Sequence, residues 1–310
     1  MKKKMFSFVS LGLVCMTFFL SCETNHQDEE QQLDTAIEIP EKIISNADAA
    51  VLFQNDHNTR LSKIGKEKIS FKDKAIHFGL AKLTDYIEHL EAIAIARNIP
   101  ITGVNFIFGV SNEGNRTTFL MPSTRNAKLD YQESFTIENG QFLTFKHIQK
   151  TVHVRESSIN DENLILSTDG YISFNEASIL FNRFEMQYIQ PFASKVAKEF
   201  YTKAVWYSLD EIKCYMSYIQ KRSNEFDLKI TGIDVFFGVY DTNADLELKS
   251  NAQTVFLVAS NQKQSIINTK KVTLQSFTQN NFYTKETSSD EENESLTFNE
   301  GQLSPPPKNN

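Results

Sequence analysis

The 310-residue sequence lacks the short motifs that mark the commonest catalytic and phosphate-binding sites. It contains no G-x-S-x-G nucleophile motif, no H-E-x-x-H zinc-peptidase motif and no G-x-x-x-x-G-K-S/T phosphate-binding loop. Basic residues are fewer than acidic ones, 32 against 39, so the formal net charge is −7 at pH 7. Nucleic-acid binding requires a basic surface. We therefore predict no nucleic-acid partner, no catalytic residue and no cofactor, and we favour a non-enzymatic protein over an enzyme.

Cysteine is scarce, and only one of the three residues is expected to remain as an ordinary thiol. Cys15 lies in the N-terminal apolar segment and Cys22 follows that segment closely, which leaves Cys214. One cysteine cannot form an intramolecular disulfide or a cluster of thiolate metal ligands. Cys214 falls on a predicted helix beside core positions, a setting typical of a buried, inert thiol.

The only long apolar run of the sequence lies at its N-terminus. It follows three lysines, covers residues 5–20 without a charge, and is about 16 residues long, shorter than the roughly 20 needed to span a membrane. A basic start and a short apolar core are typical of a secretory signal peptide. The run leads into Phe-Leu-Ser-Cys at residues 19–22, which resembles a bacterial lipobox with phenylalanine in place of the more usual leucine. We expect residues 1–21 to be removed and Cys22 to be the lipid attachment site. The alternatives are an ordinary signal with a chance cysteine and an uncleaved anchor.

Residues 22–42 are predicted to form a disordered acidic tether, because they are rich in Glu, Asp, Gln and Thr and contain few large apolar side chains. Residues 26–30, His-Gln-Asp-Glu-Glu, loosely resemble the acidic export signals of Bacteroidota surface lipoproteins. We therefore expect a lipid anchor in the outer membrane, with the periplasmic and the cell-surface face both open.

An internal repeat predicts the organisation of the rest of the chain. Three sequence matches recur at a spacing of 128 or 129 residues: Ile44-Ser45 with Ile172-Ser173, Ile101-Thr102-Gly103 with Ile230-Thr231-Gly232, and Phe108-Gly109-Val110 with Phe237-Gly238-Val239. Phe119-Leu120 corresponds to Phe256-Leu257 at a spacing of 137, so the preceding loop is longer in the second half. We predict a tandem duplication, with repeat 1 at residues 43–165, repeat 2 at residues 166–303 and a proline-rich tail at residues 304–310.

Each repeat is predicted to be α+β, with two helices followed by an antiparallel hairpin or sheet. Capping boxes mark helix starts at Ser45 and Ser173, and a third box at Ser208 matches a start near Gly79 in repeat 1. Apolar residues then recur at steps of three and four, up to Pro100 in repeat 1. Alternating apolar residues predict strands at 104–110, 117–121 and 233–239, with further strands at 142–145 and 147–154. The two glycine pairs of the repeat, Gly103/Gly232 and Gly109/Gly238, are expected to mark turns or close backbone approach.

The histidines and one acidic loop are the remaining candidates for a metal site. All six histidines precede the second repeat, and His77 aligns with Trp206, so the repeat does not preserve them. His147 and His153 would share one face of a strand; a metal pair there stays open, although packing is favoured. The loop at residues 241–247 alternates oxygen side chains like the start of a calcium loop, but Leu246 replaces the required glycine and Ala252 the bidentate glutamate. We favour a solvated loop and predict no metal.

The repeated pattern is a helix with Tyr86 or Tyr215, then T-G-V/I, F-G-V and a T-x-F-L strand. It resembles a group of duplicated-domain predicted lipoproteins of the Bacteroidota that has no assigned function. The resemblance covers residues 44–260 and implies fold rather than chemistry, since no active residues are assigned in the group. Members often end in Cys-Pro-Pro, and here Ser304 stands at the place of that cysteine.

These features favour a cell-envelope lipoprotein whose two repeats form a binding or scaffolding surface for an envelope protein or glycan. The alternative from a different class is an envelope hydrolase or carbohydrate-active enzyme with a dispersed site. A small-molecule-binding lipoprotein that feeds a transporter is a third hypothesis.

Overall fold

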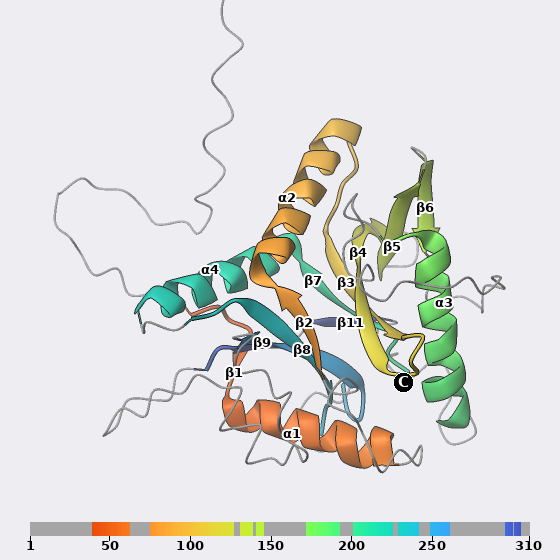
Figure 1. Cartoon of the computed structure of the whole chain (residues 1–310), viewed down its shortest axis with the longest axis vertical. Helices are drawn as coiled ribbons and strands as arrows, with labels where there is room; N and C mark the ends of the chain where they lie inside the picture. The colour runs from red at the N-terminus through yellow and green to blue at the C-terminus, as the bar shows by residue number, and fades with distance from the viewer. Residues whose placement is uncertain are drawn as a thin grey trace, which may run out of the picture. The chain divides into compact units, whose positions relative to one another are not determined.

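The computed structural model of the protein describes residues 39–62, 75–126, 131–138, 141–145, 172–192, 201–225, 229–241, 249–260, 295–299 and 301–304 (Figure 1). These residues form four α-helices and two antiparallel sheets, which confirms the α+β class. None of the helices in the described ranges is long and apolar enough to cross a membrane. The expected signal peptide and Cys22 lie outside these ranges.

The helices begin where the capping residues predict. Helix α1 (Asn46–Asp56) follows Ser45, and α3 (Phe174–Phe184) follows Ser173, which forms a complete capping box with Glu176. Helix α4 (Leu209–Glu225) follows Ser208, whose hydroxyl and amide bond reciprocally to Glu211. Helix α2 (Leu80–Arg97) follows Gly79 and ends before Pro100, at Asn98 in the left-handed conformation. Short π-helical or 3₁₀ turns extend two of the helices: η1 (His57–Leu61), η5 (Glu185–Ile189) and η6 (Gln190–Phe192).

The first sheet has the strand order β1-β10-β9-β8-β2, and the second has the order β11-β7-β3-β4-β5-β6. The predicted hairpins β3–β4 and β8–β9 are confirmed, as is the strand at β6; the strand predicted at 147–154 lies outside the described residues. Strands β2 and β7, just before α2 and α4, were not predicted. The strand bounds are β1 Ile43–Ile44, β2 Ala75–Gly79, β3 Gly103–Val110, β4 Arg116–Asn126, β5 Tyr131–Glu138, β6 Gln141–Phe145, β7 Ala204–Ser208, β8 Gly232–Val239, β9 Gln253–Ser260, β10 Thr297–Phe298 and β11 Gln302–Ser304.

Each sheet contains strands from both halves of the chain. We call β2 and β7 the exchanged strands because each pairs with a strand of the other half, β2 with β8 and β7 with β3. Strand β2 pairs antiparallel with β8, from Ala75 opposite Phe236 to Gly79 opposite Gly232. Strand β7 pairs with β3, from Ala204 opposite Ile107 to Ser208 opposite Gly103. The two registers match residue by residue. Adding 129 to a β2 number gives its counterpart on β7, and subtracting 129 from a β8 number gives its counterpart on β3.

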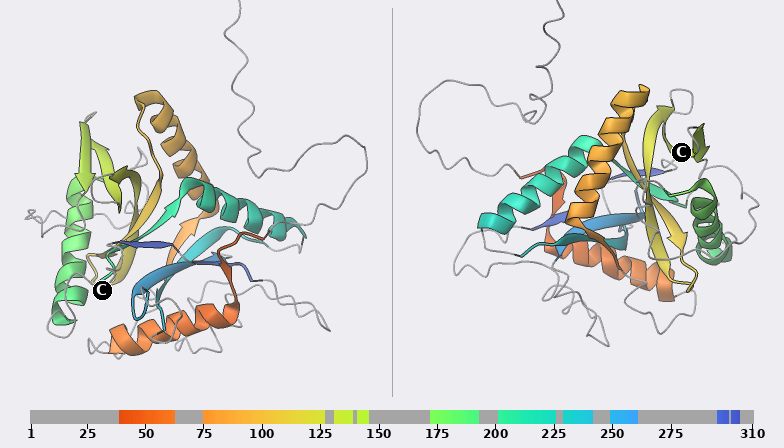
Figure 2. Two further views of the ribbon diagram at one scale, coloured as in Figure 1. Left: turned by 180° about the vertical axis from the view of Figure 1, so that it is seen from behind. Right: turned by 45° about the horizontal axis from the view of Figure 1, so that its top comes forward.

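The helices follow the same exchange. Helix α1 lies against β8, and α3 lies against β3 (Figure 2). A methyl group at Gly238 of β8 would lie 3.0 Å from Cβ of Leu52, and one at Gly109 of β3 would lie 3.0 Å from Cβ of Leu180. These glycines therefore permit close helix–sheet packing, which confirms the close approach predicted for Gly109 and Gly238.

Aromatic side chains join the two sheets in a common core. Phe108 of β3 and Phe237 of β8 meet edge to face with ring centroids 5.7 Å apart. On the other face of β8, Phe236 packs against Phe53 of α1. Strands β3 and β8 are therefore buried along their whole length. Both faces are covered because a helix packs on the second face of each strand, α1 on β8 and α3 on β3.

Candidate functional site

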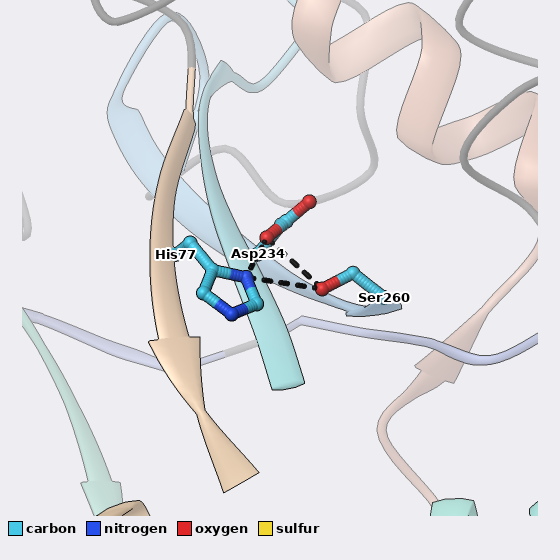
Figure 3. Close-up of polar contacts among 3 residues, drawn as sticks. All are labelled: His77, Asp234 and Ser260. Atoms are coloured by element: carbon cyan, nitrogen blue, oxygen red, sulfur yellow. Dashed lines mark hydrogen bonds and ion pairs between the residues drawn. The ribbon is translucent and has the colours of Figure 1, made fainter. Parts of the chain in front are cut away.

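A partly buried polar cluster lies where β2 joins the first sheet, and it consists of His77, Asp234 and Ser260 (Figure 3). His77 Nδ1 lies 2.7 Å from Oδ1 of Asp234, and the Ser260 hydroxyl donates to the same oxygen over 3.0 Å. Ser260 Oγ is also 3.3 Å from His77 Nδ1. Because an ionised carboxylate can only accept hydrogen bonds, we assign a proton to Nδ1 of His77.

The sheet register places these three side chains together. His77 is directly opposite Asp234 in the β2–β8 pair, and Ser260 is opposite Gly232 in the β8–β9 pair. A methyl group at Gly232 would lie 2.3 Å from Cε1 of His77 and 2.6 Å from the carbonyl oxygen of Phe78. Only glycine therefore lets the imidazole lie over the backbone of β8.

The hydrogen bonds of the cluster offset the cost of burying the Asp234 carboxylate, which has little contact with water. The side chain of Asp234 is 5% exposed and that of His77 is 29% exposed. A buried charge is costly unless it is paired and hydrogen-bonded, and here both conditions are met. Tyr215 stays neutral beside this charge: burial raises its pKa well above the ordinary value, with smaller contributions from Tyr218 and Asp234. Its hydroxyl donates to the carbonyl oxygen of Leu296.

The three residue types are those of a serine-hydrolase triad, but their geometry differs from it. In that triad the carboxylate holds one imidazole nitrogen and the nucleophilic hydroxyl contacts the other. Here the carboxylate and the Ser260 hydroxyl both lie on the Nδ1 side of His77, and Nε2 points away from both (Figure 3). The imidazole therefore has no contact through which Nε2 could remove the Ser260 proton.

An equivalent, uncharged cluster lies where β7 joins the second sheet. Trp206 occupies the place of His77, and its indole N–H donates to Oγ of Ser123 over 2.8 Å. Asn105 occupies the place of Asp234, and its amide donates to Ser134 over 2.8 Å. A methyl group at Gly103 would lie 2.2 Å from the carbonyl oxygen of Tyr207. Both clusters thus lock an exchanged strand over a glycine, and this shared arrangement indicates a structural role for the His77 cluster.

A second buried charge pair lies outside these clusters. The guanidinium of Arg116 binds Asp56 through two hydrogen bonds of 2.9 and 2.6 Å, and it lies 4.0 Å from the ring centroid of Phe237. Arg60 is nearby and donates to the carbonyl oxygen of Asn251. Burial lowers the pKa of Arg60, although the charge of Asp56 opposes that effect. This pair ties α1 to β4, and both carboxylate oxygens of Asp56 are engaged by the guanidinium.

Most of the residues singled out from the sequence lie outside the part of the chain that the structure describes. Cys22, His26, His147, His153 and residues 242–247 of the acidic loop lie outside the described ranges. Cys214 lies on α4 and is partly buried. In the part of the chain that the structure describes, no group of three or more His, Cys, Asp or Glu side chains is placed to hold a metal ion.

Sequence reasoning missed the His77 cluster. His77 was compared with Trp206, but its partner Asp234 lies 157 residues away and meets it only through the exchanged strand. The only signal was the alignment itself, which places both residues in short runs just before a helix, Ala75–Gly79 and Ala204–Ser208. It does not say with which strand either run pairs.

No protein-family model matches the chain, and no curated protein or solved structure is significantly similar to it.

Proposed function

We propose that the protein is a non-enzymatic lipoprotein of the outer membrane that binds or organises another envelope component, a protein or a glycan. The observation that carries this proposal is the geometry of the His77 cluster, in which hydroxyl and carboxylate share one side of the imidazole. The cluster has a neutral counterpart at Trp206, so its chemistry is dispensable at the equivalent place. The lipobox at residues 19–22 supports the anchor.

We also infer a tandem duplication, and with it the grouping with the duplicated-domain lipoproteins of the Bacteroidota. The matching registers of β2–β8 and β7–β3 support it, as do the sequence matches at spacings of 128 to 137. One further match adds to them: Thr-x-x-x-Gly-Gln at residues 136–141 recurs at residues 297–302, on β5–β6 and β10–β11. An ancestral two-chain assembly that exchanged its first helix and strand would yield this arrangement after fusion.

The anchor is tested by replacing its attachment residue. Cells that express Cys22→Ser are expected to incorporate no labelled palmitate into the protein, which then leaves the membrane fraction, because the acylated thiol is gone. The matched control is Cys15→Ser, which changes a cysteine of the signal peptide and should retain full labelling. Palmitate labelling of Cys22→Ser, with continued membrane association, would show that the anchor is assigned wrongly.

The competing function is a hydrolase, favoured by the pairing of a buried aspartate with a histidine whose Nε2 lies outside the cluster. We expect a fluorophosphonate probe to leave Ser260 unlabelled, and Ser260→Ala to leave any ester hydrolysis by the purified chain unchanged. A true triad nucleophile would lose on the order of 10⁶-fold in kcat on removal. Ser123→Ala is the control at the neutral cluster. Selective loss of activity in Ser260→Ala would show that the protein is a hydrolase and would contradict the proposed non-enzymatic function.

A further inference from the structure

The first sheet ends at β2, and the structure describes β8 as the partner strand on one side of it only. The amide of Leu80, directly after β2, donates to the carbonyl oxygen of Thr231, on the β8 side. Because backbone groups alternate along a strand, the N–H and C=O of Ile76 and Phe78 also point toward β8. Those of Ala75 and His77 therefore point to the other side, where they can accept a further strand.

The equivalent edge in the second sheet shows what such a strand looks like. There β11 pairs antiparallel with β7, with Gln302 opposite Trp206 and Leu303 opposite Val205. Leu303 is buried in the core. Gly301 precedes the strand, and a methyl group there would lie 2.4 Å from Cγ1 of Val205. The segment bound at this edge, residues 301–304, thus has the pattern glycine, polar residue, apolar residue, small residue.

Side chains are more exposed at the β2 edge than at the β7 edge, as expected when only β7 has a second neighbouring strand in the described structure. Ala204 and Val205 of β7 are fully buried under β11. Their counterparts on β2, Ala75 and Ile76, are partly exposed within the described structure. An apolar residue laid against Ile76 would cover it as Leu303 covers Val205.

The strand that corresponds to β11 in the first half of the chain is already engaged. By the match between residues 136–141 and 297–302, that strand is β6. Strand β6 pairs instead with β5, from Gln141 opposite Glu138 to Phe145 opposite Ser134. The other described strands are likewise paired within their sheets. Among the strands that the structure describes, none is therefore left to cover the β2 edge.

We propose that the edge of β2 binds an extended peptide segment of a partner protein, antiparallel, with an apolar residue against Ile76 and a polar residue opposite His77. Binding would add a strand to the first sheet through backbone hydrogen bonds, with side-chain specificity from alternate positions. This inference rests on the proposed binding function and names its partner as a polypeptide rather than a glycan.

The test uses a synthetic peptide with the sequence of residues 299–304, titrated into the purified full-length chain. Binding is expected, with slowed hydrogen exchange of the Ala75 and His77 amides in NMR spectra. Ala75→Pro removes an outward N–H without breaking a bond to β8, so binding should fall at least about tenfold, as the loss of a strand-addition hydrogen bond predicts. Ala75→Val keeps the N–H and should bind like the parent. Absence of binding to the parent chain, or equal binding by Ala75→Pro, would overturn the proposal.

Thermal unfolding separates an open edge from one covered within the chain. Ala204→Pro removes an N–H that faces β11 and should lower Tm by about 2–4 °C or more, whereas Ala75→Pro should leave Tm unchanged. An equal loss in both variants would mean that the chain covers β2 itself. A dimer of the parent chain that Ala75→Pro abolishes would make a second copy the occupant and would equally overturn the inference. Peptide binding is independent of the lipid, so a failed anchor assignment would show only in the Cys22→Ser experiment.

Discussion

Replacing Arg116 with methionine is expected to lower the free energy of unfolding by about 3–5 kcal/mol, the usual cost of removing one partner from a buried ion pair. Arg116 and Asp56 are 1% and 2% exposed, and the two hydrogen bonds between them satisfy both carboxylate oxygens. Without the guanidinium, Asp56 would stay buried without that partner, and Phe237 would lose the cation that lies over its ring.

Denaturant unfolding followed by circular dichroism measures this loss. Lys213→Met is the matched control, because it breaks a pair with Glu91 whose side chains are 36% and 39% exposed. An exposed pair contributes only about 0–1 kcal/mol. The double variant Asp56→Leu/Arg116→Met should recover part of the stability, since neither member of the pair is left buried alone. Recovery should be incomplete because Arg60 loses the favourable charge of Asp56. A loss below that of Lys213→Met would contradict the assignment of the Arg116 pair as a main contact between α1 and β4.

Gly103→Ala is expected to destabilise the protein by about 3 kcal/mol or more, because overpacking against fixed backbone is costly. The added methyl group would lie 2.2 Å from the carbonyl oxygen of Tyr207 and 2.5 Å from Nε1 of Trp206. Relief requires β7 to move away from β3, which breaks the exchanged pairing. Gly232→Ala should act similarly at the β2–β8 pair, where the methyl group would meet His77 and Phe78.

The control for these variants lies in the same ladder. Gly79 pairs with Gly232, yet a methyl group at Gly79 would meet nothing within 4 Å. Its φ of −61° is open to any residue, so Gly79→Ala should change the free energy of unfolding by no more than about 0.5 kcal/mol. Denaturant melts of the three alanine variants provide the comparison. If Gly103→Ala and Gly232→Ala unfold like Gly79→Ala, the exchanged strands are not packed as described.

The helix starts and the central strands were predicted correctly because they depend on residues close together in the sequence. The boxes at Ser173 and Ser208 cap α3 and α4 as predicted, since their hydrogen bonds join residues three apart. Apolar alternation predicted strands β3 and β8, and the glycines of these strands do mark close approach. Strands β2 and β7 escaped prediction because each has five residues and leads directly into a helix.

The candidate site could not be predicted for a related reason. His77 and Asp234 are far apart in sequence, and neither stands in a motif. Their contact depends on the pairing of β2 with β8 instead of with β3, the next strand along its own half. Neither the apolar alternation of β3 nor that of β8 distinguishes these two pairings, because both strands present similar residues to an incoming edge strand.

The sequence by itself determined the class of elements, the helix starts, the central hairpins and the prediction of a lipid on Cys22. Each of these follows from a short run of residues and the chemistry of adjacent side chains and backbone groups. Only the tertiary structure decided that the halves exchange a helix and a strand, that Asp234 is buried beside His77, and that β2 forms an edge. These features depend on which of two equivalent surfaces a segment packs against. That choice is made by the packing of Leu52 on Gly238, Leu180 on Gly109 and the ring of His77 on Gly232, contacts between residues more than 70 positions apart.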